Sequence, residues 1–335
     1  MILKTTGYFI FSLDFELHWG MIDKVDVSQY EENLKNVKLV IPRLLELANT
    51  YNIKLTFATV GFLFAKDKNE LLYYKPKQLP TYKDKKFDPY SKIDSIGNNE
   101  QEDGFHYASN LIDEISKSQK HEISTHTYSH YYCLEDGQTK EQFEADLLAA
   151  RAIALKKNIE INSIVFPRNQ VNNNLLETCY KNGINCYRGT ENNPIYNTGN
   201  KKIHGNIIAK GLRVADSFIN LTGHHTYKIE NQRKEAQIIN IPSSRFLRPY
   251  SSTLKLFDPL RISRVKSAMT HAAKNNEVYH LWNHPHNLGK NIDENFKALE
   301  SIFDHYNNLN KKYNFRSMTM KELAKNYSNI NETLL

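Results

Sequence analysis

YFIFSLD, at residues 8–14, decides the fold class of this 335-residue chain. The stretch is rich in residues that favour strands, and it ends at an acidic residue. Residues 34–48 then carry apolar side chains at intervals of three and four, which predicts a helix; Pro42 inside this stripe indicates either a kink or a late helix start. IKLTFATV, at residues 53–60, predicts a second strand. Strand, helix and strand in this order are typical of a parallel βαβ unit.

The same alternation continues along the chain. The end of a helix at residues 111–117 is followed by a short strand at residues 122–125. The clearest helix is expected over residues 139–157, because Thr139 and Gln142 form a T-x-x-Q capping box at its start. Further strands are expected at residues 162–166, 184–188, 237–241 and 278–282. Repeated alternation of this kind predicts a parallel sheet, either open or closed into a barrel.

Two long polar stretches interrupt this alternation. Residues 66–104 form an irregular run, which we interpret as an insertion that covers or walls a substrate site. Residues 190–235 are rich in Asn and Gly. A helical segment is expected at the carboxyl end, over residues 300–335.

Bulk composition excludes several classes of protein. Hydrophobic residues are 40% and charged residues 24% of the chain, as in ordinary globular proteins. The net charge is +7, but Lys is scattered and forms no basic block, which argues against a nucleic-acid partner. We interpret this charge as solvated surface with a weak preference for anionic substrates, such as phosphate-bearing sugars.

Cysteine usage and the N-terminal residues bear on the compartment. Cys133, Cys179 and Cys186 show no CxxC spacing, so neither a disulfide framework nor a zinc ribbon is expected, and a reducing compartment fits better. The first residues lack the continuous apolar core and the cleavage site of a signal peptide, and no run of eighteen apolar residues occurs. We therefore expect a cytoplasmic protein without a membrane span.

Acidic and imidazole side chains follow two of the predicted strands. Asp14 and Glu16 are two residues apart, so on a strand both carboxylates project to the same side; one could bind a metal ion while the other takes a proton. His126 and His130, in HTYSH, have a spacing that lets two imidazoles converge on one ion. Two imidazoles and one carboxylate would leave open positions for water and substrate. Taken separately, the carboxylates could be merely solvated and the histidines merely hydrogen-bonded.

Two later strands also end in polar motifs. Arg168, in FPRNQ, could form a bidentate pair with a catalytic carboxylate, or could be an ordinary surface residue. HLWNHPH carries three imidazoles, those of His280, His284 and His286, one of which could protonate a leaving amine while others serve packing or surface polarity.

Taken in this order, SLDFE, HTYSH, FPRNQ and HLWNHPH resemble the motifs of the NodB-like polysaccharide deacetylases, carbohydrate esterase family four. The segment LTFATVGFLF, at residues 55–64, is similar to the second strand of that family, and the resemblance spans about residues 8–290. It implies a distorted (β/α) barrel with its site at the carboxyl ends of the strands, formed by one catalytic domain over residues 1–335.

The resemblance also implies a role for each matching residue. Asp14 would be the catalytic base, oriented by Arg168, and His284 the catalytic acid, with His286 as the alternative. Asp216 would tune this acid, and a backbone N–H near Tyr131 would stabilise the oxyanion. One divalent metal ion is implied, zinc first, with cobalt, nickel and iron as alternatives. The residues that would hold it are Glu16, His126 and His130.

The expected activity is hydrolysis of an N-acetyl group on a sugar with release of acetate. We expect a biosynthetic intermediate of a surface polysaccharide, nucleotide-linked or lipid-linked, as the substrate. One alternative is a metal-independent glycoside hydrolase that uses Asp14 and another carboxylate. Another is a non-catalytic carbohydrate-binding protein on the same fold. The sequence does not predict an oligomeric state.

Overall fold

A curled, mainly parallel sheet organises the molecule, whose computed structural model describes residues 6–198, 205–232 and 234–333. The strand order is β6-β7-β5-β4-β3-β2-β1-β9-β8, with β10 paired to β1, and β6 with β7 is the antiparallel pair. The strands are β1 (Tyr8–Phe15), β2 (Leu55–Thr59), β3 (Glu122–Thr125), β4 (Ser163–Val165), β5 (Cys186–Arg188), β6 (Lys234–Glu235), β7 (Ile238–Asn240), β8 (Arg245–Phe246), β9 (Val278–Asn283) and β10 (Arg316–Ser317).

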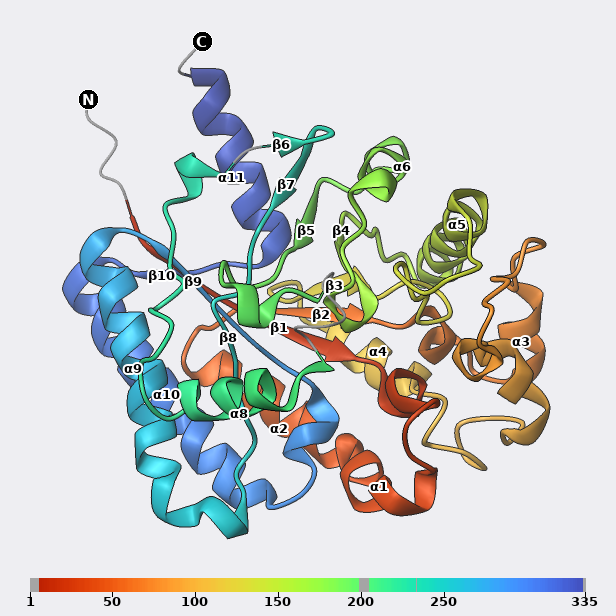
Figure 1. Cartoon of the computed structure of the whole chain (residues 1–335), viewed down its shortest axis with the longest axis horizontal. Helices are drawn as coiled ribbons and strands as arrows, with labels where there is room; N and C mark the ends of the chain where they lie inside the picture. Colours follow the sequence, from red (N-terminus) through yellow and green to blue (C-terminus); the bar gives the residue numbers. More distant parts are fainter. Residues whose placement is uncertain (1–5, 199–204, 233, 334–335) are drawn as a thin grey trace.

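Helices surround this sheet (Figure 1). They are α1 (Val27–Lys35), α2 (Val37–Thr50), α3 (Lys68–Tyr73), α4 (Ser109–Lys117), α5 (Lys140–Lys156), α6 (Leu176–Lys181), α8 (Ile207–Asp216), α9 (Asp258–Asn275), α10 (Ile292–Tyr313) and α11 (Met320–Thr333). The distorted (β/α) barrel expected from the sequence is confirmed, in the form of a curled half-barrel. No helix in the described parts of the chain is long and apolar enough to cross a bilayer.

β1 shows how the sequence sets the two sides of the sheet. Successive strand residues face opposite sides, so Phe9, Phe11 and Leu13 join the large core under the helices. Ile10 joins a smaller apolar cluster that contains residues of β4, β5, β9 and α11. Asp14 shares the face of Ile10 and lies at the carboxyl end of the strand. The inner face therefore changes from apolar to ionisable along β1.

The helix expected over residues 139–157 is found as α5, whereas the stripe at residues 34–48 is divided between α1 and α2 at Asn36. Thr139 caps α5, and the capping box with Gln142 is present. Pro42 lies inside α2, which begins at Val37, so the expected late helix start is wrong. Proline has no N–H to donate to the carbonyl of Lys38, four residues earlier. Because Lys38 is exposed, a water molecule can donate to that carbonyl instead.

The insertion at residues 66–104 has an ordered structure that includes α3 and two 3-10 segments, Lys85–Phe87 and Pro89–Ser95. Its buried Tyr82 accepts a hydrogen bond from the backbone N–H of Tyr132, at 2.8 Å. None of its residues lines the cavity described below. The segment packs against the HTYSH loop, and its expected role as a cover or wall of the substrate site stays a prediction.

Candidate active site

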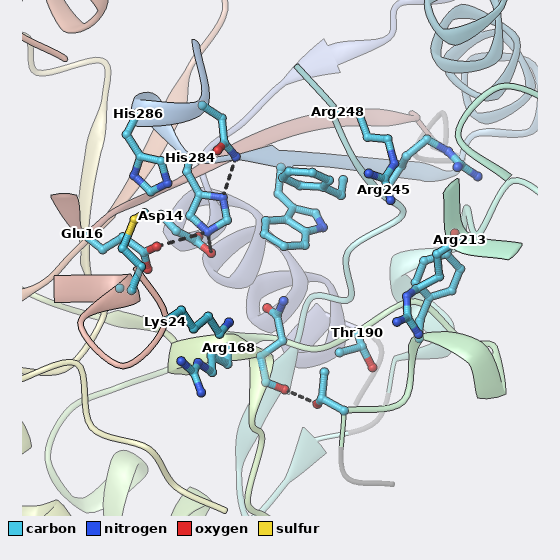
Figure 2. Close-up of a pocket in the computed structure, with 18 of the residues that line it drawn as sticks. Asp14, Glu16, Lys24, Arg168, Thr190, Arg213, Arg245, Arg248, His284 and His286 are labelled. Atoms are coloured by element: carbon cyan, nitrogen blue, oxygen red, sulfur yellow. Dashed lines mark hydrogen bonds and ion pairs between the residues drawn. The ribbon is translucent and has the colours of Figure 1, made fainter. Parts of the chain in front are cut away.

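A cavity of about 530 Å³ opens where the carboxyl ends of several strands meet. Asp14 and Glu16 come from the end of β1, Glu191 follows β5, and Trp282 and His284 come from the end of β9 (Figure 2). Because these strands run parallel in one curled sheet, their carboxyl ends bring residues far apart in the sequence to one site.

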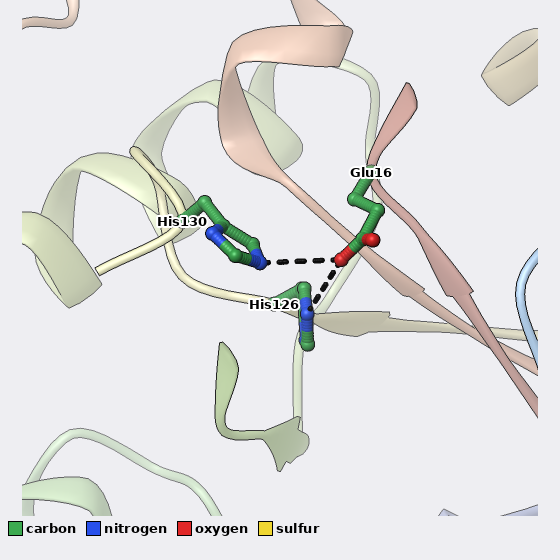
Figure 3. A group of neighbouring side chains, drawn as sticks. All are labelled: Glu16, His126 and His130. Carbon is green, nitrogen blue, oxygen red and sulfur yellow. Dashed lines mark hydrogen bonds and ion pairs between the residues drawn. The ribbon is translucent and has the colours of Figure 1, made fainter. Parts of the chain in front are cut away.

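Glu16, His126 and His130 form a buried cluster inside this region (Figure 3). The Glu16 Oε2 atom lies 3.3 Å from His126 Nε2 and 3.2 Å from His130 Nε2. All three side chains are at most 7% exposed. Their candidate ligand atoms lie within 4.8 Å of one another, a spacing at which they could hold one metal ion.

The loop after β3 aims both imidazoles at this carboxylate. His126 Nδ1 donates to the carbonyl of Val165 at 2.8 Å, which leaves Nε2 with its lone pair towards Glu16. Thr127 and His130 adopt left-handed backbone conformations, with φ of 63° and 58°, and these reverse the loop so that the second imidazole turns back to the first.

Unpartnered atoms show that this cluster fits a metal ion. The lone pair of His126 Nε2 faces a carboxylate oxygen, and the atom has no hydrogen-bond partner. Two facing acceptors without a proton or cation between them are costly in a buried site. A metal ion bound between them would remove that cost. Burial lowers the pKa of His130 to about 4, so its imidazole is in the neutral form that binds metals.

Gly20 makes room for the carboxylate of Glu16. A Cβ at this position would lie 2.0 Å from Glu16 Cδ and Oε1. Burial by itself would raise the pKa of Glu16, but the surrounding imidazoles of His284, His126 and His130 hold it well below its usual value. The carboxylate is therefore ionised, as a metal ligand must be.

Asp14 is paired with Arg188 in a buried fork. Arg188 donates from Nη1 to Asp14 Oδ1 at 2.8 Å and from Nη2 to Oδ2 at 2.7 Å. Burial would raise the pKa of Asp14, but Arg188 and the nearby imidazoles of His126 and His284 lower it overall. Asp14 is thus an ionised, oriented carboxylate beside the metal-ligand cluster.

His284 faces both carboxylates of β1. Its Nε2 lies 3.5 Å from Glu16 Oε1 and 3.8 Å from Asp14 Oδ2, and its Nδ1 accepts a hydrogen bond from Asn287 at 3.1 Å. The imidazole of His286 stacks behind it, with ring centroids 5.0 Å apart. Burial lowers the pKa of His286 to about 3, so this second imidazole is neutral.

Comparison with known proteins agrees with this arrangement. The family model described as polysaccharide deacetylase matches residues 36–187, somewhat less than half of the chain. Over these residues the chain is similar to polysaccharide deacetylases. This match contains His126 and His130, whereas Asp14 and His284 lie outside it. No sequence among the curated proteins matches the chain.

Solved structures support the fold of a polysaccharide deacetylase. A protein from Mycobacterium smegmatis described as a polysaccharide deacetylase has a TM-score of 0.63 at 11% identity, over 99% of this chain and 93% of that one. One of the same description from Pseudomonas aeruginosa has a TM-score of 0.53 at 11% identity, over 95% and 89%. A 4-α-glucanotransferase from Thermococcus litoralis reaches 0.53 at 12% identity, over 96% and 40%. At these identities the likeness concerns the fold alone.

The deacetylase motif FPRNQ does not supply the expected partner of Asp14. Arg168 forms an ion pair with Asp23, and its guanidinium lies 4.5 Å from the ring centroid of Tyr132. The expected pair with Asp14 is therefore wrong, and Arg188 takes its place. Arg168 lies in a tight 3-10 turn beyond β4 with φ of 56°, whereas Arg188 ends β5 and extends directly across the sheet interior.

Sequence reasoning missed Arg188 although a signal was present. It is a charged residue at the carboxyl end of a predicted strand, in a deacetylase-like barrel whose strand ends carry the site. Its guanidinium also bonds to Ser12 and Asn169 and lies 4.4 Å from the ring centroid of Trp282. These contacts fix its orientation towards Asp14.

The structure also bears on two supporting residues. Asp216 accepts a hydrogen bond from Tyr196 at 2.8 Å and forms an ion pair with Arg245 at 3.1 Å, so its expected pairing with the catalytic imidazole is wrong. The backbone N–H of Tyr131 donates to Thr127 Oγ1 at 2.6 Å. This N–H is engaged within the loop, and the expectation that a backbone N–H near Tyr131 stabilises the oxyanion stays a prediction.

Proposed function

We propose that this protein is a metal-dependent hydrolase that removes the acetyl group from an N-acetyl sugar. The single observation that supports this most strongly is the placement of the buried Glu16–His126–His130 cluster beside a carboxylate that Arg188 holds ionised. Glu16, His126 and His130 would hold the metal ion. When bound, a divalent ion of this kind polarises the amide carbonyl and lowers the pKa of a water molecule.

Asp14 acts as the general base in this proposal. Its carboxylate takes a proton from the attacking water, whose oxygen forms a bond to the amide carbon. Arg188 holds both carboxylate oxygens and keeps the group ionised between turnovers.

His284 acts as the general acid. It donates a proton to the sugar nitrogen as the C–N bond breaks, which gives acetate and a free amine. Its Nε2 faces the two carboxylates, whereas His286 stacks on its far side, and this geometry favours His284 for the role. Zinc is the first candidate for the metal, because imidazole and carboxylate ligands with open positions suit it.

The test is acetate release from a panel of N-acetylated sugars by the zinc-loaded protein. Asp14→Asn should lower turnover by about 10²–10⁴-fold, the usual contribution of a general base, while the metal content stays unchanged. Full activity of this variant would contradict the assigned base. The exposed Arg316→Gln serves as the control and should match the wild type.

Glycoside hydrolysis is a second candidate because the cavity holds another carboxyl group. Glu191 lines the same cavity, and burial raises its pKa, as for a general acid. This alternative would be favoured if the protein released reducing sugar but no acetate. The release should persist after removal of metal and be abolished in Glu191→Gln.

The substrate is, in our proposal, an intermediate of surface-polysaccharide biosynthesis inside the cell. Fractionation of the native cell should place the protein in the cytoplasm. Recovery from outside the inner membrane would contradict this part of the proposal.

A further inference from the structure

Cationic side chains line the cavity away from the metal-ligand cluster. Arg213 comes from α8, Arg245 from β8, and Arg248 from the segment after β8 (Figure 2). Lys24 and Arg168 lie on the side of Glu16. The cavity is thus bordered by positive charge beyond the reaction centre, which the chemistry of amide hydrolysis does not itself require.

Two of these cations are neutralised by a carboxylate in an ion pair, whereas Arg248, within the described chain, is not. Arg168 pairs with Asp23, and Arg245 pairs with Asp216. The half-buried side chain of Arg248 has no hydrogen bond or ion pair among the described residues. Burial, together with the charge of Arg213, lowers the pKa of Arg248, as expected for crowded cations.

The same wall has spare hydrogen-bond donors. Arg248 lines the cavity and its side chain has no partner among the described residues, whereas Arg245 is 4% exposed and donates from both Nη atoms to Asp216. Donors that line a cavity without a protein partner are available to a ligand acceptor. Guanidinium groups present their donors in a planar fork that fits the oxygens of phosphate.

Two aromatic rings connect this wall to the reaction centre. Phe246 of β8 is in register with Trp282 of β9, and their ring centroids are 4.7 Å apart. Trp282 in turn lies 5.5 Å from His284, between ring centroids. Arg245 and Arg248 flank Phe246 in the sequence. A sugar whose amide reaches the acid would therefore extend over the aromatic pair towards the arginines.

We propose that the substrate carries a phosphate or diphosphate group on its sugar, and that Arg248, with the charge of Arg245 beside it, binds this group. This inference rests on the proposed deacetylase function and deepens it. A phosphate monoester carries about −1.5 to −2 charges near neutral pH, which suits a wall with an unneutralised arginine beside others. A neutral oligosaccharide would leave the charge of Arg248 without a partner.

The first test measures binding, independently of turnover. Inorganic diphosphate is titrated calorimetrically into the full chain loaded with zinc, as wild type, Arg248→Gln and the control Arg316→Gln. Loss of one charge-assisted contact should weaken binding about 10–100-fold in Arg248→Gln and leave the control unchanged. Equal affinity in all three proteins would overturn the proposal. A fourth variant, Glu16→Gln, tests the metal: affinity that falls in Glu16→Gln but not in Arg248→Gln would also overturn the proposal, because the metal ion would then bind the anion.

The second test separates the sources of the phosphate. Acetate release is compared for N-acetylglucosamine, its 1-phosphate and its uridine-diphosphate conjugate. A lower KM for either phosphorylated sugar, lost in Arg248→Gln, supports the proposal, and the better substrate identifies the source. If an N-acetylated sugar acid binds as tightly as the phosphorylated sugars, and this binding is lost in Arg248→Gln, the proposed phosphate group would be contradicted and a carboxylate group favoured.

The two proposals fail in distinguishable ways. Diphosphate binding that depends on Arg248, with no acetate released from any sugar, would contradict the deacetylase function and leave the anion subsite intact. Acetate release from neutral sugars with unchanged kinetics in Arg248→Gln would overturn the phosphate subsite and leave deacetylation intact.

Discussion

Single side chains decide which groups can react in this cavity, and Arg188 is the one whose effect is easiest to isolate. We expect Arg188→Gln to lower turnover about 10²-fold or more, because Asp14 would lose its bidentate partner and its orientation. Arg188→Lys should recover little, since an ammonium cannot replace the fork. Steady-state kinetics and metal content measure the two effects separately.

Arg168→Gln is the matched comparison for this prediction. Its guanidinium contacts Asp23 instead of Asp14, so the kcat of this variant should stay within a few-fold of the wild type. A large loss of kcat in Arg168→Gln with little loss in Arg188→Gln would contradict the pairing found in the structure.

Gly20 provides a second test because its missing Cβ protects a metal ligand. In Gly20→Ala the new methyl group would displace the carboxylate of Glu16, so zinc affinity should fall at least 10-fold while the fold persists. Gly211→Ala is the control, since nothing lies within 4 Å of a Cβ at that position in α8. Competition with a zinc-binding dye measures both; unchanged affinity in Gly20→Ala would show that Glu16 does not bind the ion.

The sequence predicted these residues unevenly, for physical reasons. Asp14 and Glu16 were found because strand alternation puts both on one face, and HTYSH because its spacing is local. Arg168 follows a strand and Arg188 ends one. Only the local direction of the backbone at each residue decides which guanidinium reaches Asp14. Asp216 likewise pairs with an arginine from another strand, a contact that no local pattern indicates.

Helix α5 holds the metal-motif loop through one buried carboxyl group. Asp146 accepts hydrogen bonds from the backbone N–H of Tyr128, at 2.7 Å, and of Ser129, at 3.2 Å. The capping box that starts this helix was predicted, whereas the role of Asp146 was not, because its partners lie outside its own helix. β8 and β10 also escaped prediction, since two-residue strands carry no periodic pattern.

Burial gives Asp146 a pH-dependent effect on stability. It raises the pKa of this carboxyl group from 3.8 to about 6, so the folded chain holds the proton more tightly than the unfolded chain. The resulting stabilisation is complete below about pH 4 and is lost as the pH rises through 6. By linkage this amounts to about 3 kcal/mol.

Urea unfolding of wild type and Asp146→Asn between pH 4 and pH 7 measures this effect. The free energy of unfolding of the wild type should fall relative to that of the variant as the pH rises. Glu31→Gln, at an exposed position in α1, should run parallel to the wild type. Parallel curves for wild type and Asp146→Asn would contradict the assignment.

The whole molecule is a curled parallel sheet with an apolar inner cluster at one end of β1 and the candidate site at the other. The βα alternation predicted this class of fold, because the spacing of apolar residues and the turn residues can be recognised within short stretches of sequence. The sequence did not predict that the insertion at residues 66–104 packs behind the HTYSH loop. That packing depends on Tyr82 meeting a backbone group fifty residues away.

The central claim is that one chain holds one catalytic metal ion at the end of β1. The most direct test is the zinc content per chain after reconstitution and gel filtration, for wild type, His126→Ala and the exposed control His271→Ala. We predict about one zinc per chain in the wild type and in His271→Ala, since two imidazoles and a carboxylate make a complete ligand set for a catalytic site, and a loss of most of it in His126→Ala. Absence of stoichiometric metal in the wild type, or equal metal in all three proteins, would contradict the claim.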